Sequence, residues 1–72
     1  MPSWKELKRY CIRDGWENYK TTDHFFYRKI LPNGEILHTK VSNSSSQIGP
    51  ALWRRILKDQ LRTTQEHFDD VI

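Results

Sequence analysis

The segment DHFFYRKILPNGEILHTKV, residues 23–41, holds two runs of strand-forming residues on either side of a tight-turn sequence. Pro32 presets one turn angle, and Gly34 can adopt the positive φ that such turns require. We therefore expect residues 23–31 and 36–41 to form a β-hairpin. One face of this hairpin should be buried, so the rest of the chain has to cover it.

A helix is predicted before the hairpin. The sequence SWKE is a capping box, in which Ser3 accepts from the backbone amide of Glu6 and Glu6 reaches back. Apolar residues then recur at helical spacing at Trp4, Leu7, Tyr10 and Cys11. Gly15 suits the left-handed conformation that ends many helices, so the helix is placed at residues 3–14.

The remaining segments predict one more strand and two more helices. Residues 16–20 can form a short strand, and residues 42–47 form a polar loop. Pro50 suits the first turn of a second helix. The apolar face of that helix is formed by Leu52, Trp53, Ile56, Leu57 and Leu61. Residues 63–72 can form a short last helix, in which Thr63 and Glu66 fit a second capping box and Phe68, Val71 and Ile72 dock on the body.

The predicted fold is a single α+β domain covering residues 1–72, with the order α-β-β-β-α and a short C-terminal helix. Its three-stranded antiparallel sheet should have the helices on one face. This order of elements is that of double-stranded-RNA-binding domains. Because a fold does not determine a function, the function has to be argued from particular residues.

The charge of the chain is distributed unevenly. The 72 residues include 12 Lys and Arg and 9 Asp and Glu, a net charge of +3. Residues 1–62 hold all 12 bases but only 6 acids, a net charge of +6, whereas residues 63–72 hold 3 acids and no base. A basic body with an acidic tail favours a polyanionic partner.

Several classes of protein are disfavoured by the composition. A single cysteine, Cys11, cannot form an intrachain disulfide, and it is expected to be a buried thiol in a reducing cytoplasm. No apolar run approaches the ~20 residues that span a bilayer, so no membrane partner is expected. The N-terminus has no apolar core of a secretory signal.

The turn also predicts which hairpin residues share a face. A three-residue loop at residues 32–34 would pair Ile30 with Ile36, Arg28 with His38, Phe26 with Lys40 and His24 with Ser42. Since side chains alternate along a strand, Phe25, Tyr27, Leu37 and Val41 should be buried. The opposite face should carry His24, Phe26, Arg28, His38 and Lys40.

This basic face with a central aromatic is suited to RNA. Arginine and lysine contact phosphates, and an aromatic ring can stack on an unpaired base. Histidine, with a typical pKa of about 6.5, can take and give protons at neutral pH. RNA supplies its own nucleophile, the 2′-hydroxyl, so one histidine with neighbouring cations can suffice for cleavage. The ordinary alternatives are that His24 is a surface histidine and that His38 is its solvated neighbour.

Other chemistries find little support. The side chains His24, His38, His67 and Cys11 lack the spacing of metal ligands, so no metal and no cofactor are expected. No Gly-rich phosphate loop and no Ser/His/Asp pattern is present in the sequence. The basic stripe of the second helix is by default a solvated face, but it adds Arg54, Arg55 and Lys58 to the candidate RNA-binding residues.

Three segments carry a resemblance to a known family. WKELKRYCIRDGW, residues 4–16, is a helix that ends in Gly and Trp, and TDHFFYR, residues 22–28, places a histidine before strand residues. IGPALWRRILKDQLRTTQEHFDDVI, residues 48–72, joins a Leu-x-x-Ile-Leu helix to a short acidic helix with a central Phe. In order and spacing, the chain resembles the HicA-type toxins of bacterial toxin–antitoxin systems, which are small mRNA interferases with a double-stranded-RNA-binding-like fold.

The resemblance implies that His24 is the catalytic residue and that the protein cleaves mRNA and so arrests translation. It also implies a HicB-type antitoxin partner that covers the site and, with the toxin, binds operator DNA. Two features depart from the family. Thr22 and Asp23 replace the usual Gly and Ser, and KVSNSSSQ, residues 40–47, replaces a Pro-rich segment. An acid beside the histidine could orient the ring or repel phosphate.

Two other functions remain open at this point. A non-catalytic RNA-binding domain that blocks translation by occupancy would need the same charges. A protein-interaction module with an acidic partner would need them as well, but it would have no affinity for RNA at low salt.

Overall fold

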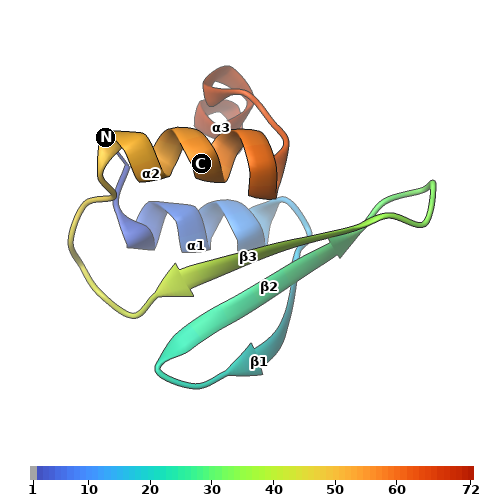
Figure 1. The fold of residues 1–72 in the computed structure, drawn as a ribbon, viewed down its shortest axis with the longest axis horizontal. Coiled ribbons are helices and arrows are strands. Elements are labelled where there is room, and N and C mark those ends of the chain that lie inside the picture. Colours follow the sequence, from blue (N-terminus) through green and yellow to red (C-terminus); the bar gives the residue numbers. More distant parts are fainter. Residues whose placement is uncertain (1) are drawn as a thin grey trace.

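The computed structural model describes residues 2–72 and confirms the predicted α+β fold (Figure 1). Its elements are α1 (Trp4–Arg13), β1 (Glu17–Thr21), β2 (His24–Ile30), β3 (Ile36–Ser42), α2 (Pro50–Arg55), the π-helix η1 (Ile56–Leu61) and α3 (Gln65–Val71). Within this part of the chain, the strands form a three-stranded antiparallel sheet in the order β1-β2-β3. Figure 1 shows the helices gathered above the sheet and β1 farthest from them.

The ends of α1 are those predicted from the sequence. The hydroxyl of Ser3 accepts from the backbone N–H of Glu6 at 3.2 Å, and the backbone N–H of Ser3 donates to Glu6 Oε1 at 3.0 Å. These bonds satisfy two amides that the first turn leaves unpaired. Gly15 has a φ of +83°, which lets the chain turn from α1 toward β1.

The hairpin has the predicted register from His24↔Ser42 to Ile30↔Ile36. Leu31 N–H donates to the carbonyl of Glu35 at 2.7 Å and closes the predicted three-residue loop, in which Gly34 has a φ of +90°. The pairing places alternate side chains under the helices, and Tyr27, Leu37, Thr39 and Val41 are buried there. By contrast, every residue of β1 is exposed, so the helices cover β2 and β3 but not β1.

The second helix differs from the expected α-helix because it changes to a π-helix at Ile56. Ile56 and Leu61 are both buried, at 1% and 3% exposure. In an α-helix, two residues five positions apart would point to different faces. The i→i+5 geometry of a π-helix returns both side chains to the core. Leu52, which was expected on the apolar face, is instead 41% exposed.

The predicted cap of the last helix was wrong by one residue. Thr64, not Thr63, is the N-cap of α3, and its hydroxyl accepts from the backbone N–H of His67 at 3.1 Å. The shift arises because Arg62 takes a left-handed conformation, with a φ of 52°, and the N–H of Thr63 still bonds to Leu57 at 3.0 Å. The expected docking is confirmed, since Phe68 is buried and Val71 and Ile72 pack against the core.

The thiol of Cys11 is fully buried in α1, as expected. Burial raises its pKa to about 12, and the nearby charge of Asp14 adds to the effect. The thiol therefore stays protonated and unreactive at neutral pH. Among the helices of residues 2–72, none has the length and apolar character required to cross a bilayer.

Asp14 joins α1 to β2 and to the start of β1. Its carboxylate accepts from Lys29 Nζ at 2.9 Å and from the Trp16 indole at 3.0 Å. Burial by itself would raise the pKa of Asp14, but these two hydrogen bonds and the charge of Lys29 outweigh it and hold the pKa below its usual value. Asp14 thus stabilises the fold in its charged form.

Acidification should therefore lower the free energy of unfolding by the contribution of the charged Asp14 carboxylate. A carboxyl whose pKa is lower in the folded state stabilises the fold above its unfolded pKa of about 3.9, and this contribution is lost as the pH falls through the folded value. We expect Asp14→Asn to cost on the order of 1 kcal/mol at pH 7 and less below pH ~3. Urea unfolding of both proteins at the two pH values measures this, and a cost that does not change with pH would contradict it.

Candidate nucleic-acid interface

The outer face of the hairpin carries the side chains that alternate with those buried in the core, and at its His24 end it borders the helices. His24, Phe26 and Arg28 are half-buried on this face, whereas His38 and Lys40 are exposed. Because the register of β2 and β3 is the predicted one, all of these side chains share the face on which they were expected. The structure then decides which of them can act together.

His24 begins β2 and lies where the end of the hairpin meets α1 and α2. Its ring forms part of the wall of a cavity of about 450 Å³. The other lining residues are Trp4, Lys40, Ser42, Leu52, Ile56 and Gln60. The cavity therefore has an apolar wall from the helices and a polar, basic wall from the strands.

The ring of His24 is held by packing and not by a hydrogen bond at Nδ1. This nitrogen is buried, and it has no partner among residues 2–72. In many catalytic sites an acceptor fixes one ring nitrogen and so sets the tautomer that the other presents. Asp23 does not fill this role, since it is exposed and no hydrogen bond or ion pair joins it to His24 in the described chain.

Lys40 is the cation that the sheet brings to His24. His24 pairs with Ser42, so Lys40 is its diagonal neighbour on the same face. Such neighbours lie roughly 7–8 Å apart, within reach of a long side chain. Lys40 lines the same cavity and is exposed, and within residues 2–72 it forms none of the ion pairs. Its ammonium group is therefore available to an anion.

Arg28 and His38 lie at the other end of the face. They pair with each other, and Arg28 is four positions from His24 along β2, or roughly 13 Å at ~3.3 Å per residue. Arg28 is also engaged, because its Nε donates to Glu17 Oε1 at 2.5 Å. The structure therefore does not bring Arg28 or His38 to a phosphate that His24 could contact.

Tyr19 is a further member of this face that the sequence analysis did not select. A β-bulge between Asn18 and Lys20 leaves Tyr19 as the extra residue of β1. Its ring centroid lies 6.3 Å from that of Phe26 and 5.8 Å from that of His38. The only available signal was an aromatic beside a lysine in the run WENYK, and the register of β1 could not be derived across a bulge.

Two cations rest on these aromatic rings. The guanidinium carbon of Arg28 is 5.1 Å from the ring centroid of Tyr19, and Lys20 Nζ is 5.4 Å from that of Phe26. A shallow cavity of about 270 Å³ opens beside the rings and is lined by Tyr19, Phe26, His38, Thr39, Lys40 and Gln60. Since Lys40 and Gln60 also line the His24 cavity, the two cavities adjoin.

The basic residues of the second helix lie apart from both cavities. Arg54, Arg55 and Lys58 are exposed on α2 and η1, and none of the three lines either cavity. They can widen the positive surface but do not belong to the group around His24.

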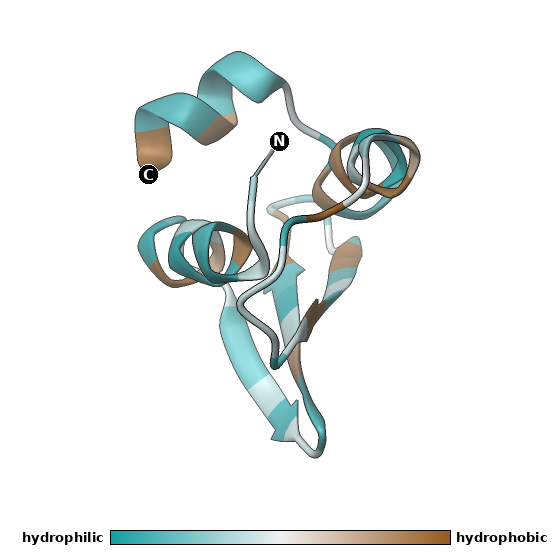
Figure 2. Ribbon diagram, turned by 90° about the vertical axis from the view of Figure 1, so that its left-hand side faces the viewer, coloured by the Kyte–Doolittle hydropathy of each residue, from teal (hydrophilic) through white to brown (hydrophobic). Residues whose placement is uncertain are grey.

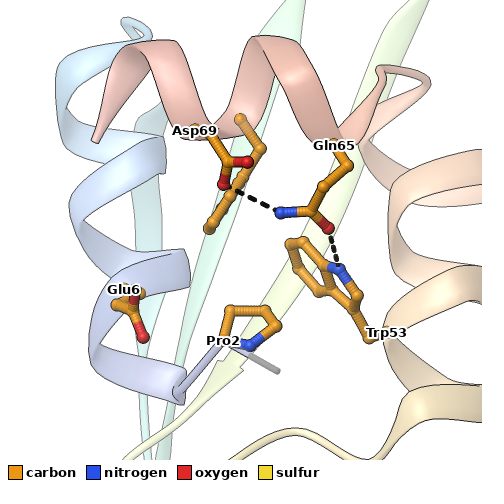
Figure 3. A pocket seen from close by; sticks show the side chains of 6 residues that line it. Pro2, Glu6, Trp53, Gln65 and Asp69 are labelled. Atoms are coloured by element: carbon orange, nitrogen blue, oxygen red, sulfur yellow. Dashed lines mark hydrogen bonds between the residues drawn. The ribbon is translucent and has the colours of Figure 1, made fainter.

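Three of the nine acidic residues, Glu66, Asp69 and Asp70, lie on α3. The helix α3 lies beyond α1 and α2, away from the strands (Figures 1 and 2). A cavity of about 360 Å³ among the helices is lined there by Glu6 and Asp69 (Figure 3). Both carboxylates already accept hydrogen bonds, Glu6 from the backbone N–H of Ser3 and Asp69 from Gln65. Trp53 Nε1 donates to Gln65 at 2.7 Å, and Gln65 donates to Asp69 at 2.9 Å. The three acids of residues 63–72, with no base among them, would repel a phosphate at this end.

The fold and this surface define a small α+β domain with an aromatic and basic sheet face beside a histidine-lined cavity. In residues 2–72, no group of three or more His, Cys, Asp or Glu side chains is placed to hold a metal ion. Comparisons with protein-family models, with curated proteins and with solved structures found no match for this chain.

Proposed function

We propose that this protein binds single-stranded RNA on the outer face of its sheet and cleaves it beside His24. The observation that carries the proposal is the shared cavity of His24 and Lys40, which places a group able to accept a proton next to an unpaired cation. The neighbouring Tyr19 and Phe26 offer rings on which an unpaired base can stack.

In the proposed reaction, His24 removes the proton of a ribose 2′-hydroxyl, and that oxygen attacks the adjacent phosphorus. The bond from phosphorus to the 5′-oxygen breaks, and solvent protonates the leaving oxygen. The products are a 2′,3′-cyclic phosphate and a 5′-hydroxyl end. The ammonium of Lys40 offsets the charge that develops on the other phosphate oxygens. Every atom of the reaction comes from RNA, His24 and water.

The biological role that we propose is that of a HicA-type toxin, an mRNA interferase that arrests translation in the cytoplasm. It rests on the resemblance of the three sequence segments and on the α-β-β-β-α order of the elements. The proposed partner is a HicB-type antitoxin, and covering the His24 cavity would be its simplest means of inhibition.

A second function is favoured by one observation. Nδ1 of His24 is buried without an acceptor, so no hydrogen bond from residues 2–72 sets the tautomer of the ring at that nitrogen. A domain that represses translation by occupancy would use the same aromatic and basic face without requiring that hydrogen bond.

One assay separates these functions. Purified protein is incubated at low salt, with a chelator, with end-labelled single-stranded RNA and with DNA of the same sequence. The proposal predicts RNA fragments with cyclic phosphate ends and intact DNA, because DNA lacks the 2′-hydroxyl. Intact RNA with a salt-dependent gel shift would support occupancy. Absence of both cleavage and binding would overturn the RNA proposal and favour an acidic protein partner.

A further inference from the structure

We propose that Gln60 selects the nucleobase that stacks in the cavity of Tyr19 and Phe26, and that it favours uracil and guanine, which carry the carbonyl oxygens O4 and O6, over cytosine, which carries the N4 amino group in place of O4. This inference rests on the RNA binding proposed above and names the substrate class of the same surface. It is carried by the geometry of Gln60 and its neighbours.

Gln60 is presented to the sheet by the π-helix η1. The wider turn of this helix keeps Ile56 and Leu61 in the core and sets Gln60 beside β3, where it lines both cavities. π-Helical turns are rare, and they occur frequently at functional sites. Here the turn brings a polar side chain from the helix layer to the aromatic rings of the outer face.

The amide of Gln60 is oriented by a buried hydroxyl. Thr39 is only 4% exposed, and its hydroxyl donates to Gln60 Oε1 at 2.7 Å. The carbonyl of Gln60 is therefore engaged, while its NH₂ group forms no hydrogen bond with any residue of the described chain. In this orientation both N–H donors of the Gln60 amide are free for a ligand, whereas the carbonyl oxygen already accepts one hydrogen bond.

The size and polarity of the cavity fit one unpaired base. Its volume of about 270 Å³ is near the lower end of ligand pockets, which suits a single planar ring more than a whole nucleotide. Lys40 contributes a second donor at the same wall. Uracil presents the acceptor O4, and guanine presents O6 and N7, whereas cytosine presents the donor N4 at the corresponding position. Two donors therefore match uracil and guanine and leave the cytosine amino group unpaired.

Uracil and cytosine homopolymers provide the test, because the two bases have nearly the same shape. Short labelled oligomers with 2′-fluoro sugars lack the attacking hydroxyl and stay intact during a fluorescence anisotropy titration at fixed low salt. For the wild-type protein we expect the uracil oligomer to bind about 5- to 10-fold more tightly, since one base contact is worth roughly 1 kcal/mol or more.

Gln60→Glu should reverse this preference. The carboxylate still accepts from Thr39 but presents an acceptor in place of the donors, so cytosine should now bind more tightly than uracil. Gln47→Glu is the matched control, since Gln47 is exposed and lines neither cavity. It adds the same charge, weakens both complexes and should leave their ratio unchanged. Thr39→Val, which releases the amide, should reduce the preference while RNA still binds.

The outcomes distinguish this inference from the RNA proposal. A uracil-to-cytosine ratio near one for the wild-type protein, or a ratio that Gln60→Glu and Gln47→Glu change equally, overturns the role of Gln60 while RNA binding stands. No binding of either oligomer at low salt overturns both. Reversal with Gln60→Glu alone supports the inference.

Discussion

Replacing His24 with alanine is expected to slow the cleavage of single-stranded RNA by about 100-fold or more, because a positioned general base typically contributes roughly 10²- to 10⁴-fold. Binding should be largely retained, since Lys40, Tyr19 and Phe26 remain in place on the same face. Single-turnover rates with end-labelled RNA measure the loss, and gel shifts measure binding. Circular dichroism establishes that the variant is folded.

His38→Ala is the matched control for this experiment. His38 is the same type of residue on the same face, but it lies roughly 13 Å away along the strands and outside the His24 cavity. Its loss should leave the single-turnover rate at saturating protein close to the wild-type value, although it should weaken binding because His38 lines the cavity beside Tyr19 and Phe26. A folded His24→Ala protein that cleaves RNA normally would remove His24 from the mechanism, and an equal loss in both variants would refute the separate roles of the two histidines.

Phe68→Ala is expected to lower the free energy of unfolding more than Asp14→Asn or Asp70→Ala. Phe68 is 1% exposed, stacks on Tyr10 at 5.1 Å between centroids and meets the ring of Trp53 at 4.7 Å. Removing a buried phenyl ring costs about 3–5 kcal/mol. A domain of this size has a total stability of roughly 4–11 kcal/mol, so the variant should be mostly unfolded in moderate urea.

Asp70→Ala provides the comparison on the same helix. Asp70 is exposed, so its replacement should change the free energy of unfolding by no more than about 0.5 kcal/mol. Urea titrations followed by tryptophan fluorescence report both variants, and Phe68→Leu gives an intermediate point if the alanine variant is too unstable to titrate. Equal midpoints for Phe68→Ala and the wild type would show that α3 is not part of the cooperative core.

The hairpin could be predicted because the residues that determine it lie close together in the sequence. Pro32 and Gly34 define the loop length, the loop length defines the register, and the register assigns each side chain to a face. The same is true of α1, whose capping box and closing glycine are read directly from the sequence. These elements place His24 and Lys40 on one surface before any packing is considered.

The remaining parts of the site depend on packing between distant segments. The bulge at Tyr19 follows from how β1 pairs with β2, and no short turn sequence specifies it. The π-helix keeps both Ile56 and Leu61 in the core, and the apolar pattern that placed the two residues on one face did not distinguish a π-helix from an α-helix. As a result, Gln60 and Tyr19 were not predicted from the sequence. Arg28 was grouped with His24, although it forms an ion pair with Glu17 and lies four positions farther along β2.

The concentration of acids on α3 gives the molecule a permanent electric dipole moment with its negative end at α3. Residues 63–72 carry three acids and no base, while the rest of the chain has a net charge of +6. The field of a polyanion exerts a torque on this dipole and turns α3 away before contact. A smaller fraction of encounters then begins at the acidic side of the molecule, and this effect declines as added salt shortens the range of the field.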